Sequence, residues 1–251
     1  FYAPLRQLGA DYHVKAQAEG AIAELSPLLA FQPAEKTKAN PFILTAPPAI
    51  DADNIWVNHQ QRTRLAPLSF AIGAGERLTI VGQSGSGKST LLQIFLGFCA
   101  YQGDIFIDNQ NFNTIDSTQF RHQIAYLSQQ TMLLPMSIAD NLRLPDPTAS
   151  DDKLWQILAQ VGLKPLIKAL PNQLDTQLGE RGSGLSGGQQ RRLAIAQLLL
   201  QDAQLWLLDE PTEHLDSDTA AEINGLLQQV TRGKTVLWVT HDATNLPWLD
   251  R

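Results

Sequence analysis

Residues Gly82 to Thr90 read GQSGSGKST, a spacing of glycines, lysine and hydroxyl groups that suits phosphate binding. The stretch fits the pattern G-x-x-x-x-G-K-[ST] and lies between an apolar strand pattern and a helical one, as that motif requires. Glycines let backbone N–H groups approach a phosphate, and the helix that follows adds positive potential. The predicted phosphate-binding residues are Gly82, Gln83, Ser84, Gly85, Ser86, Gly87, Lys88, Ser89 and Thr90. We expect Lys88 to reach the β- and γ-phosphates of a nucleoside triphosphate and Ser89 to bind Mg²⁺.

Two adjacent acids end an apolar strand further along the chain, at Leu205–Glu210, LWLLDE. Carboxylates at the end of a buried strand are unfavourable unless a cation meets them. Asp209 is therefore expected to bind Mg²⁺, and Glu210 to polarise the water that attacks the γ-phosphate. The alternative is that both acids only cap the next helix.

Two further polar residues follow predicted strands. Gln129 comes just after Ile124–Leu127, and its amide can bind both Mg²⁺ and the attacking water. His241 follows the strand Thr235–Val239, where it can contact the γ-phosphate and sense its loss; the alternative for it is an ordinary surface histidine. The predicted catalytic residues are Lys88, Gln129, Glu210 and His241, and the predicted Mg²⁺ ligands are Ser89, Gln129 and Asp209.

A second anion-binding feature is the stretch LSGGQQRR at Leu185–Arg192, which precedes the apolar run LAIAQLLL. Ser186 is a good N-cap for a helix that begins here. Glycines keep the helix terminus flat, and the positive end of the helix dipole favours an anion. The start of this helix is therefore suited to an anion, and the residues alone leave open which group it faces.

These residues are positioned by alternating strand and helix patterns. The expected strands are Ile50–Val57, Leu65–Ile72, Arg77–Val81, Asp104–Ile107, Ile124–Leu127, Leu205–Leu208 and Thr235–Val239. The expected helices are Lys88–Leu96, Ser117–His122, Ser137–Leu142, Asp151–Val161, Ser186–Leu200 and Asp216–Val230. Short, fully apolar strands favour a parallel sheet that is covered on both faces. The sequence therefore predicts an α/β fold with an antiparallel N-terminal sheet and a helical insert over about 128–185.

Three segments divide the chain. Residues 1–30 have helical spacing with a thin apolar face, which fits either a surface helix or the tail of a helix from an upstream region. Residues 31–49 carry four prolines and mixed charge, as a linker does. The domain is expected over 50–251. The first residues lack methionine and a signal-peptide pattern, and no element closes the C-terminus, so we expect a C-terminally truncated piece of a longer protein.

Composition restricts the class of protein. The 251 residues are 43% hydrophobic, enough for a large core, while the longest apolar runs are far too short to span a bilayer. One cysteine, Cys99, cannot form an internal disulfide, which favours a reducing compartment such as the cytoplasm. The net charge of −6 disfavours nucleic acid as a partner.

Together these motifs resemble the nucleotide-binding domain of ABC (ATP-binding cassette) proteins, over about Ile50 to Arg251. LSGGQ is the signature of that family. The resemblance implies a P-loop NTPase fold that binds ATP and Mg²⁺, hydrolyses ATP and pairs head to tail with a second cassette. Ser186, Gly187, Gly188 and Gln189 would then contact the γ-phosphate held by the partner, and Asp216 would lie at the seam between the two.

The chain is most similar to the exporter branch. GERGSG at Gly179–Gly184 resembles the loop through which exporter cassettes contact their own transmembrane domain. FYAPLRQLGADYHVKAQAEGA and GFCAYQGDI resemble the D subunit of the CydDC family of thiol-reductant exporters, which are heterodimers. That resemblance implies export of cysteine and glutathione from the cytoplasmic face of the bacterial inner membrane, in support of cytochrome bd assembly. The segment from Leu193 to Thr240 suits the companion C subunit equally well.

Two departures from the exporter pattern matter. Where exporters place an adenine-stacking tyrosine, this sequence has His59, with Trp56 as the alternative if the strand register shifts. Glu213 and His214 replace small residues, which favours an asymmetric partner. The remaining alternatives are a soluble ABC ATPase that never meets a membrane, an exporter of another substrate, and a regulatory cassette that binds ATP without hydrolysing it. Glu210 argues against the last of these.

Overall fold

The computed structural model describes residues 12, 15, 17–26, 42–59, 62–242, 246 and 248–250. The chain forms two compact units, Phe1–Lys38 and Ala39–Arg251. In the first unit, residues 17–26 are helical, and Ser26 Oγ donates a hydrogen bond to the Ile22 carbonyl at 2.7 Å. None of the helices within the described ranges has the length and apolar content that crossing a membrane requires.

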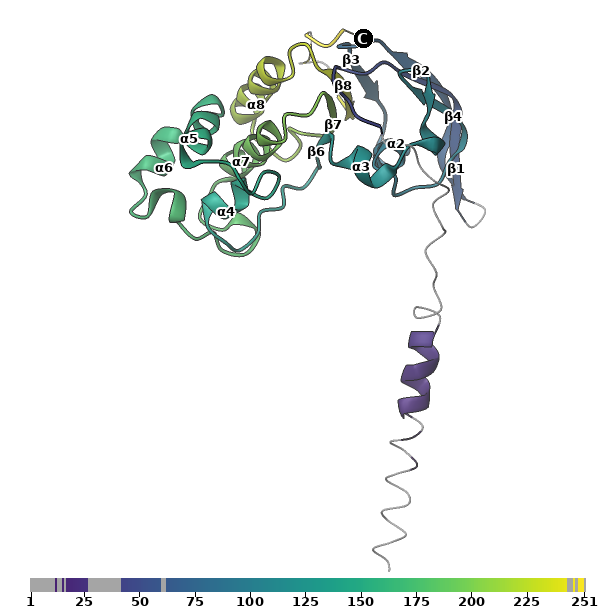
Figure 1. The fold of residues 1–251 in the computed structure, drawn as a ribbon, viewed down its shortest axis with the longest axis horizontal. Coiled ribbons are helices and arrows are strands. Elements are labelled where there is room, and N and C mark those ends of the chain that lie inside the picture. The colour runs from purple at the N-terminus through teal and green to yellow at the C-terminus, as the bar shows by residue number, and fades with distance from the viewer. Residues whose placement is uncertain are drawn as a thin grey trace, which may run out of the picture. The chain divides into compact units, whose positions relative to one another are not determined.

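Two sheets form the second unit, as the sequence predicts (Figure 1). The parallel sheet has the strand order β3-β8-β7-β6, and the antiparallel sheet has the order β2-β1-β4-β5. The parallel strands are β3 (Arg77–Val81), β6 (Ile124–Leu127), β7 (Leu205–Asp209) and β8 (Thr235–Thr240). The antiparallel strands are β1 (Ile50–His59), β2 (Arg62–Ile72), β4 (Gln102–Ile107) and β5 (Gln110–Asn111).

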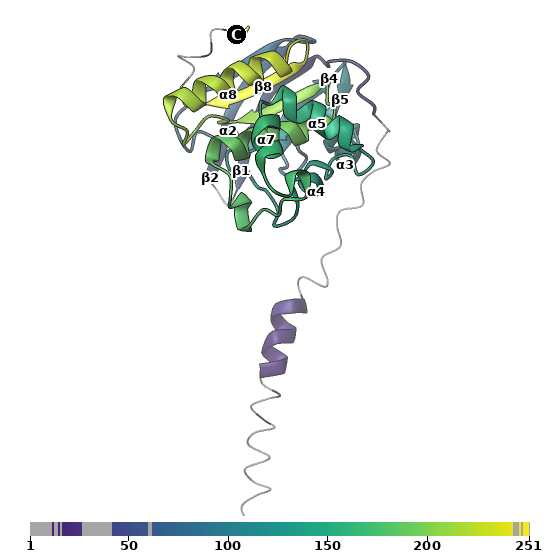
Figure 2. The same cartoon turned by 90° about the vertical axis from the view of Figure 1, so that its left-hand side faces the viewer.

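The helices connect and cover these sheets. They are α2 (Lys88–Phe95), α3 (Ser117–Arg121), α4 (Ile138–Leu142), α5 (Asp151–Gln160), α6 (Lys164–Ala169), α7 (Gly187–Leu200) and α8 (Ser217–Val230). Short 3-10 turns are η1 (Phe112–Thr114), η2 (Gln173–Asp175) and η3 (Glu180–Gly182). Helices α4, α5 and α6 form the helical insert, which Figure 1 shows on the opposite side of the parallel sheet from the antiparallel sheet; Figure 2 shows the same elements from the side of the insert.

Alternating side chains of the parallel strands divide the core in two. On β7, Leu205 and Leu207 face the antiparallel sheet and α2, while Trp206 and Leu208 pack with α7, α8 and the helical insert. All four are at most 1% exposed. Because both faces of the sheet are covered at its centre, β7 up to Leu208 and the middle of β8 are apolar, which explains the pattern that predicted them. Their carboxyl ends carry the polar residues of the candidate site.

The second unit begins before the expected domain start. Residues 42–49 were predicted as the end of a linker, but Phe42 and Leu44 pack against the core. The Gln123 side chain donates to the Phe42 carbonyl at 2.7 Å, and Thr235 Oγ1 donates to the Pro48 carbonyl at 2.7 Å. The prolines here therefore belong to an extended segment attached to the domain by long-range contacts, which composition alone does not reveal.

Candidate functional site

The phosphate-binding pattern forms the expected turn between β3 and α2. Gly87 has φ of 98°, and a Cβ added to it would lie 2.4 Å from the Arg64 carbonyl oxygen, so only glycine fits. Gly87 is also the N-cap of α2, where no side chain caps the helix. The first N–H groups of α2 are therefore available to an anion at the positive end of the helix dipole.

A cavity of about 910 Å³ opens at this turn, a size that suits a small-molecule ligand. Eight of the predicted site residues line it. They are Ser84, Gly85, Gly87, Lys88, Ser89, Thr90, Gln129 and Glu210. The sequence reasoning missed Arg62, Thr63 and Arg64, which line it from the start of β2. Two arginines beside a phosphate-binding loop add positive charge, and no spacing rule connects them to the motif because the contact is made across the fold.

Asp209, at the end of β7, is a buried carboxylate with 4% exposure. Burial raises its pKa, and the neighbouring Glu210 adds to this effect, while hydrogen bonds with Ser89 and Tyr126 and the charge of Lys88 oppose it. Burial and Asp209 together raise the pKa of Tyr126 to about 12, so its hydroxyl stays protonated and can donate. Mg²⁺ prefers oxygen ligands, and the Asp209 carboxylate and the Ser89 hydroxyl lie side by side here. These residues therefore fit the predicted ion.

Asp209→Asn is expected to make the nucleotide-free protein more stable at pH 7. A carboxyl whose pKa is raised by folding destabilises the fold once it is ionised, so the disadvantage exists above its unfolded pKa of about 4 and vanishes below it. Asparagine has no such charge and retains an acceptor for Ser89. Thermal unfolding of both proteins between pH 3 and pH 8, without metal, should show a gap that grows as pH rises. A gap independent of pH would contradict this reading.

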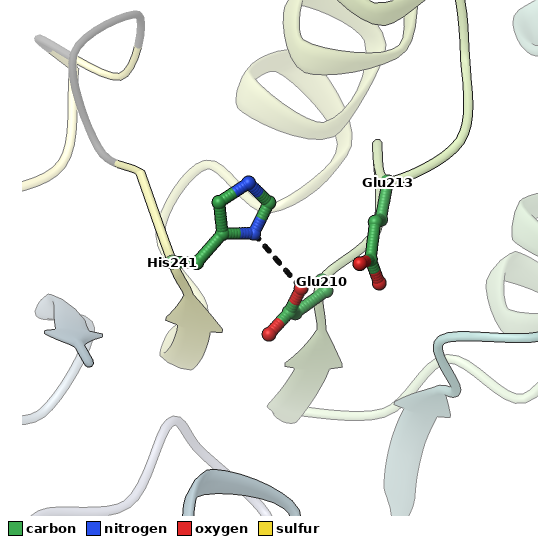
Figure 3. Close-up of side chains that lie close together, drawn as sticks. All are labelled: Glu210, Glu213 and His241. Atoms are coloured by element: carbon green, nitrogen blue, oxygen red, sulfur yellow. Dashed lines mark hydrogen bonds and ion pairs between the residues drawn. The ribbon is translucent and has the colours of Figure 1, made fainter. Parts of the chain in front are cut away.

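Glu210 lies between two nitrogen-bearing side chains. Its Oε1 is 3.1 Å from Lys88 Nζ, and its Oε2 is 3.0 Å from His241 Nδ1, the pair drawn in Figure 3. Burial acts to raise the pKa of Glu210, but the hydrogen bonds with His241 and Lys88 outweigh it and hold the pKa below its usual value. The carboxylate is thus ionised at neutral pH and can accept a proton.

The backbone at Glu210 is also unusual, with φ of 43° in the left-handed region. A residue other than glycine in that region stores strain of about 1 kcal/mol or more, and such strain concentrates at functional sites. The Glu210 N–H donates to the Val239 carbonyl at 2.9 Å, which ties the ends of β7 and β8 together. Glu210 and His241 each come directly after one of these two paired strands.

Gln129 lines the cavity just beyond β6, and its side-chain amide donates a hydrogen bond to Glu213. Figure 3 shows Glu213 on the other side of Glu210 from His241. The ligand atoms of Glu210, Glu213 and His241 lie within 4.8 Å of one another. Lys88 and Gln129 already engage the two carboxylates, so we assign no metal to this cluster.

The LSGGQ stretch starts α7 as predicted. Ser186 is the N-cap: its Oγ accepts from the Gln189 N–H at 3.3 Å, and Gln189 Oε1 accepts from the Ser186 N–H at 3.0 Å. Ser186, Gly188 and Gln189 line a cavity of about 470 Å³ that shares no lining residue with the cavity at the phosphate loop. The two anion-binding features therefore open on different parts of the surface.

Gly188→Ala is expected to lower the free energy of unfolding by about 1–3 kcal/mol, the usual range for overpacking. A Cβ at this position would lie 2.5 Å from Thr219 Cγ2, so the Thr219 side chain, or α7 relative to α8, would have to shift. Gly187→Ala is the matched control, because its nearest neighbour, Leu215 Cδ2, would be 3.7 Å away. Urea unfolding of the two variants measures the difference. Equal stabilities would show that Gly188 is not needed for this packing.

His59 and Trp56 are the two residues that the sequence offers for the adenine contact. The side chain of His59 lies outside the described residues. Trp56, the alternative, is not among the described residues that line the cavity at the phosphate loop.

A family model described as "ABC transporter" matches residues 65–213. The chain is 35% identical over 252 residues to the glutathione/L-cysteine transport system ATP-binding/permease protein CydD of Escherichia coli, covering 98% of this chain and 42% of CydD. It is 43% identical over 183 residues to CydC of the same system in E. coli, covering 72% of this chain and 32% of CydC. It thus spans less than half the length of these relatives.

A solved structure, "Structure of a bacterial Atm1-family ABC exporter with ATP bound", superposes with a TM-score of 0.81 at 30% identity. The superposition covers 98% of this chain and 43% of the exporter chain. The expected arrangement of a parallel-sheet core, an antiparallel sheet and a helical insert is confirmed by this likeness.

Proposed function

The chain belongs to the ABC transporter family as an ATP-binding domain of the exporter kind, and from this premise we propose that it hydrolyses ATP to power export of cysteine and glutathione. The observation that supports hydrolysis most strongly is the position of Glu210, an ionised carboxylate that is held by Lys88 and His241 and lines the cavity at the phosphate-binding loop. A cassette that only bound ATP would not need this base.

In this proposal the phosphates of ATP lie on the turn from Gly82 to Thr90. Lys88 turns from the Gly82 and Gln83 carbonyls, which its Nζ contacts at 2.6 and 3.0 Å, to the β- and γ-phosphates. Mg²⁺ would be held by Ser89, Gln129 and Asp209, and it would neutralise charge on the phosphates. Glu210 accepts a proton from the attacking water, and His241 keeps the Glu210 carboxylate oriented.

The second half of the ATP site would come from a partner. Ser186 and its neighbours open on a different cavity from Lys88, so one chain cannot place both on the same triphosphate without a large rearrangement. A second cassette, arranged head to tail, would bring its own counterparts of Ser186, Gly187, Gly188 and Gln189 to this nucleotide. ATP would join the two cassettes, and loss of the γ-phosphate would loosen them.

The substrate and location rest on the relatives. The E. coli relatives are named as subunits of a glutathione/L-cysteine transport system and as fused ATP-binding/permease proteins. We therefore propose a transmembrane domain in the parent protein, a paralogous partner subunit, a position at the cytoplasmic face of the bacterial inner membrane and a role in cytochrome bd assembly. Glu213 and His214, in place of small residues, favour an unlike partner.

Transport into inverted membrane vesicles tests this proposal. Vesicles that contain the parent protein and its partner are supplied with labelled glutathione or cysteine, with and without ATP. We expect accumulation of thiol only with ATP, and none when Glu210→Gln is present in the same complex. A complex that hydrolyses ATP without accumulating either thiol would reject the substrate assignment while leaving the ATPase assignment intact.

A further inference from the structure

Two residues of opposite charge outside the phosphate-binding loop contact Gln129. Arg191 binds its backbone, and Glu213 binds its side chain. Arg191, on α7, is 3% exposed, and its two terminal nitrogens donate to the carbonyls of Ser128 and Gln129, each at 2.6 Å. A planar guanidinium that spans two successive carbonyls fixes the path of the backbone between them. Burial lowers the pKa of Arg191, and the charges of Asp209 and Glu213 oppose this effect.

Glu213 holds the other end of Gln129. Its carboxylate accepts a hydrogen bond from the Gln129 side-chain nitrogen, Nε2. Glu213 is itself positioned by a turn after β7, in which its N–H donates to the Glu210 carbonyl at 3.1 Å. The carboxylate is 25% exposed, so it is neither deeply buried nor free in solvent. The bond therefore links a residue that follows β6 to one that follows β7.

The chemistry of the two groups decides which way the amide is turned. The oxygens of a carboxylate accept hydrogen bonds, so Glu213 favours the orientation of Gln129 that the structure shows, with the side-chain nitrogen facing the carboxylate. The carbonyl oxygen, Oε1, then points away from Glu213, and within the described ranges it accepts no hydrogen bond. Gln129 and Ser89 line the same cavity, and Asp209 is hydrogen-bonded to Ser89. The free oxygen thus belongs to the set of oxygens suited to a hard cation.

We propose that Glu213 and Arg191 are positioning residues, which together present the carbonyl oxygen of Gln129 to the divalent cation that accompanies the nucleotide. This inference rests on the proposed function and adds to it two residues that contact neither nucleotide nor metal. Without Glu213 the amide rotates freely, and in half of its orientations it offers an N–H group that repels a cation. Most of the effect of removing Glu213 should therefore appear in metal affinity rather than in nucleotide affinity.

The test is the binding of ATP to the purified protein by calorimetry, at increasing Mg²⁺ concentration and also with EDTA. We expect Glu213→Ala to raise the apparent dissociation constant for Mg²⁺ about fivefold, the effect of losing one hydrogen bond that orients a ligand. ATP affinity in EDTA should stay within about twofold. Glu213→Gln should restore only part of the metal affinity, because its amide can either accept from or donate to Gln129 and therefore no longer selects a single orientation.

Asp152→Ala is the control for loss of an acidic side chain, since Asp152 is an exposed residue of α5 and is not among the residues that line the cavity at the phosphate loop. Arg191→Lys should weaken Mg²⁺ binding in the same direction, because a single ammonium group cannot span two carbonyls. Thermal unfolding of each variant shows whether the protein is folded. The decisive comparison is that of Glu213→Ala with the wild type, because the partly exposed Glu213 side chain can be removed without opening the core.

The outcomes separate the two proposals. If the wild-type protein binds ATP and Glu213→Ala has the same Mg²⁺ constant, the role of Glu213 is wrong and the proposed function stands. A metal-independent loss of ATP affinity in Glu213→Ala also contradicts the positioning role. If the wild-type protein binds no ATP under any condition, both proposals fail.

Discussion

Glu210→Gln is expected to lower the rate of ATP hydrolysis by about 100- to 10,000-fold, the usual contribution of a general base, while ATP still binds. Glutamine has nearly the same shape and can still contact Lys88 and His241, but it cannot take a proton from water. Because the pKa of Glu210 is held below its usual value, the wild-type base is ionised and active at neutral pH. Bound ATP should then persist and keep the two cassettes associated.

Phosphate release by the parent complex measures the rate of ATP hydrolysis, and gel filtration with ATP measures the association of the two cassettes. Asp152→Asn, on the exposed surface of α5, is the control for loss of an acidic charge and should hydrolyse ATP normally. If Glu210→Gln retained more than a tenth of the wild-type rate, Glu210 would not be the base.

Lys88→Ala is expected to weaken ATP binding about 100-fold, within the range for truncating one member of a close charge pair. Two effects add together. The variant loses the ammonium group that meets the phosphates, and it leaves Glu210 without the cation that lies 3.1 Å away, so that a carboxylate faces the incoming anion. Calorimetry with ATP at fixed Mg²⁺ measures the change.

A double variant separates these two effects. Adding Glu210→Gln to Lys88→Ala removes the unpaired carboxylate and should recover part of the lost affinity, so the two substitutions should be non-additive. Lys234→Ala is the control, because Lys234 pairs with Asp202 on the surface, at 3.3 Å. Unchanged affinity in Lys88→Ala, or strictly additive effects in the double variant, would contradict the role given to Lys88.

The sequence predicts the parts of the site that depend on local geometry. A phosphate-binding turn needs glycine at Gly87 because a Cβ would overlap the Arg64 carbonyl, and Ser186 caps α7 within its own turn. The Ser186 cap and the left-handed backbone of Gly87 are local, so the motif carries both, whereas the approach of Arg64 to Gly87 is made across the fold. The alternation of side chains on β7 likewise follows from burial on both faces.

Other parts of the fold lack such local signals. Helix α6 was missed because it has no side-chain cap and carries Pro165 in its first turn, and strand β5 is only two residues long. For Gly188, the sequence suggested a surface kept flat for phosphate, whereas the structure adds a packing reason, the approach of Thr219 on α8.

The contacts that orient Gln129 also cannot be predicted from a sequence pattern. Arg191 and Glu213 are distant from Gln129 in the chain and meet it only because α7 and the ends of β6 and β7 converge. Arg62 and Arg64 likewise reach the cavity from a strand of the other sheet. A long-range polar contact has no fixed spacing, so only the fold shows it.

The central claim is that ATP is held between two cassettes, and that this chain contributes a different surface to each of two such sites. A structure of the parent complex, trapped with Mg²⁺ and ATP by Glu210→Gln, tests it most directly. The account predicts that the Ser186 hydroxyl of this chain lies within hydrogen-bonding distance of the γ-phosphate on the partner subunit. A trapped complex in which Ser186 faces solvent, with ATP contacted by one cassette alone, would contradict it.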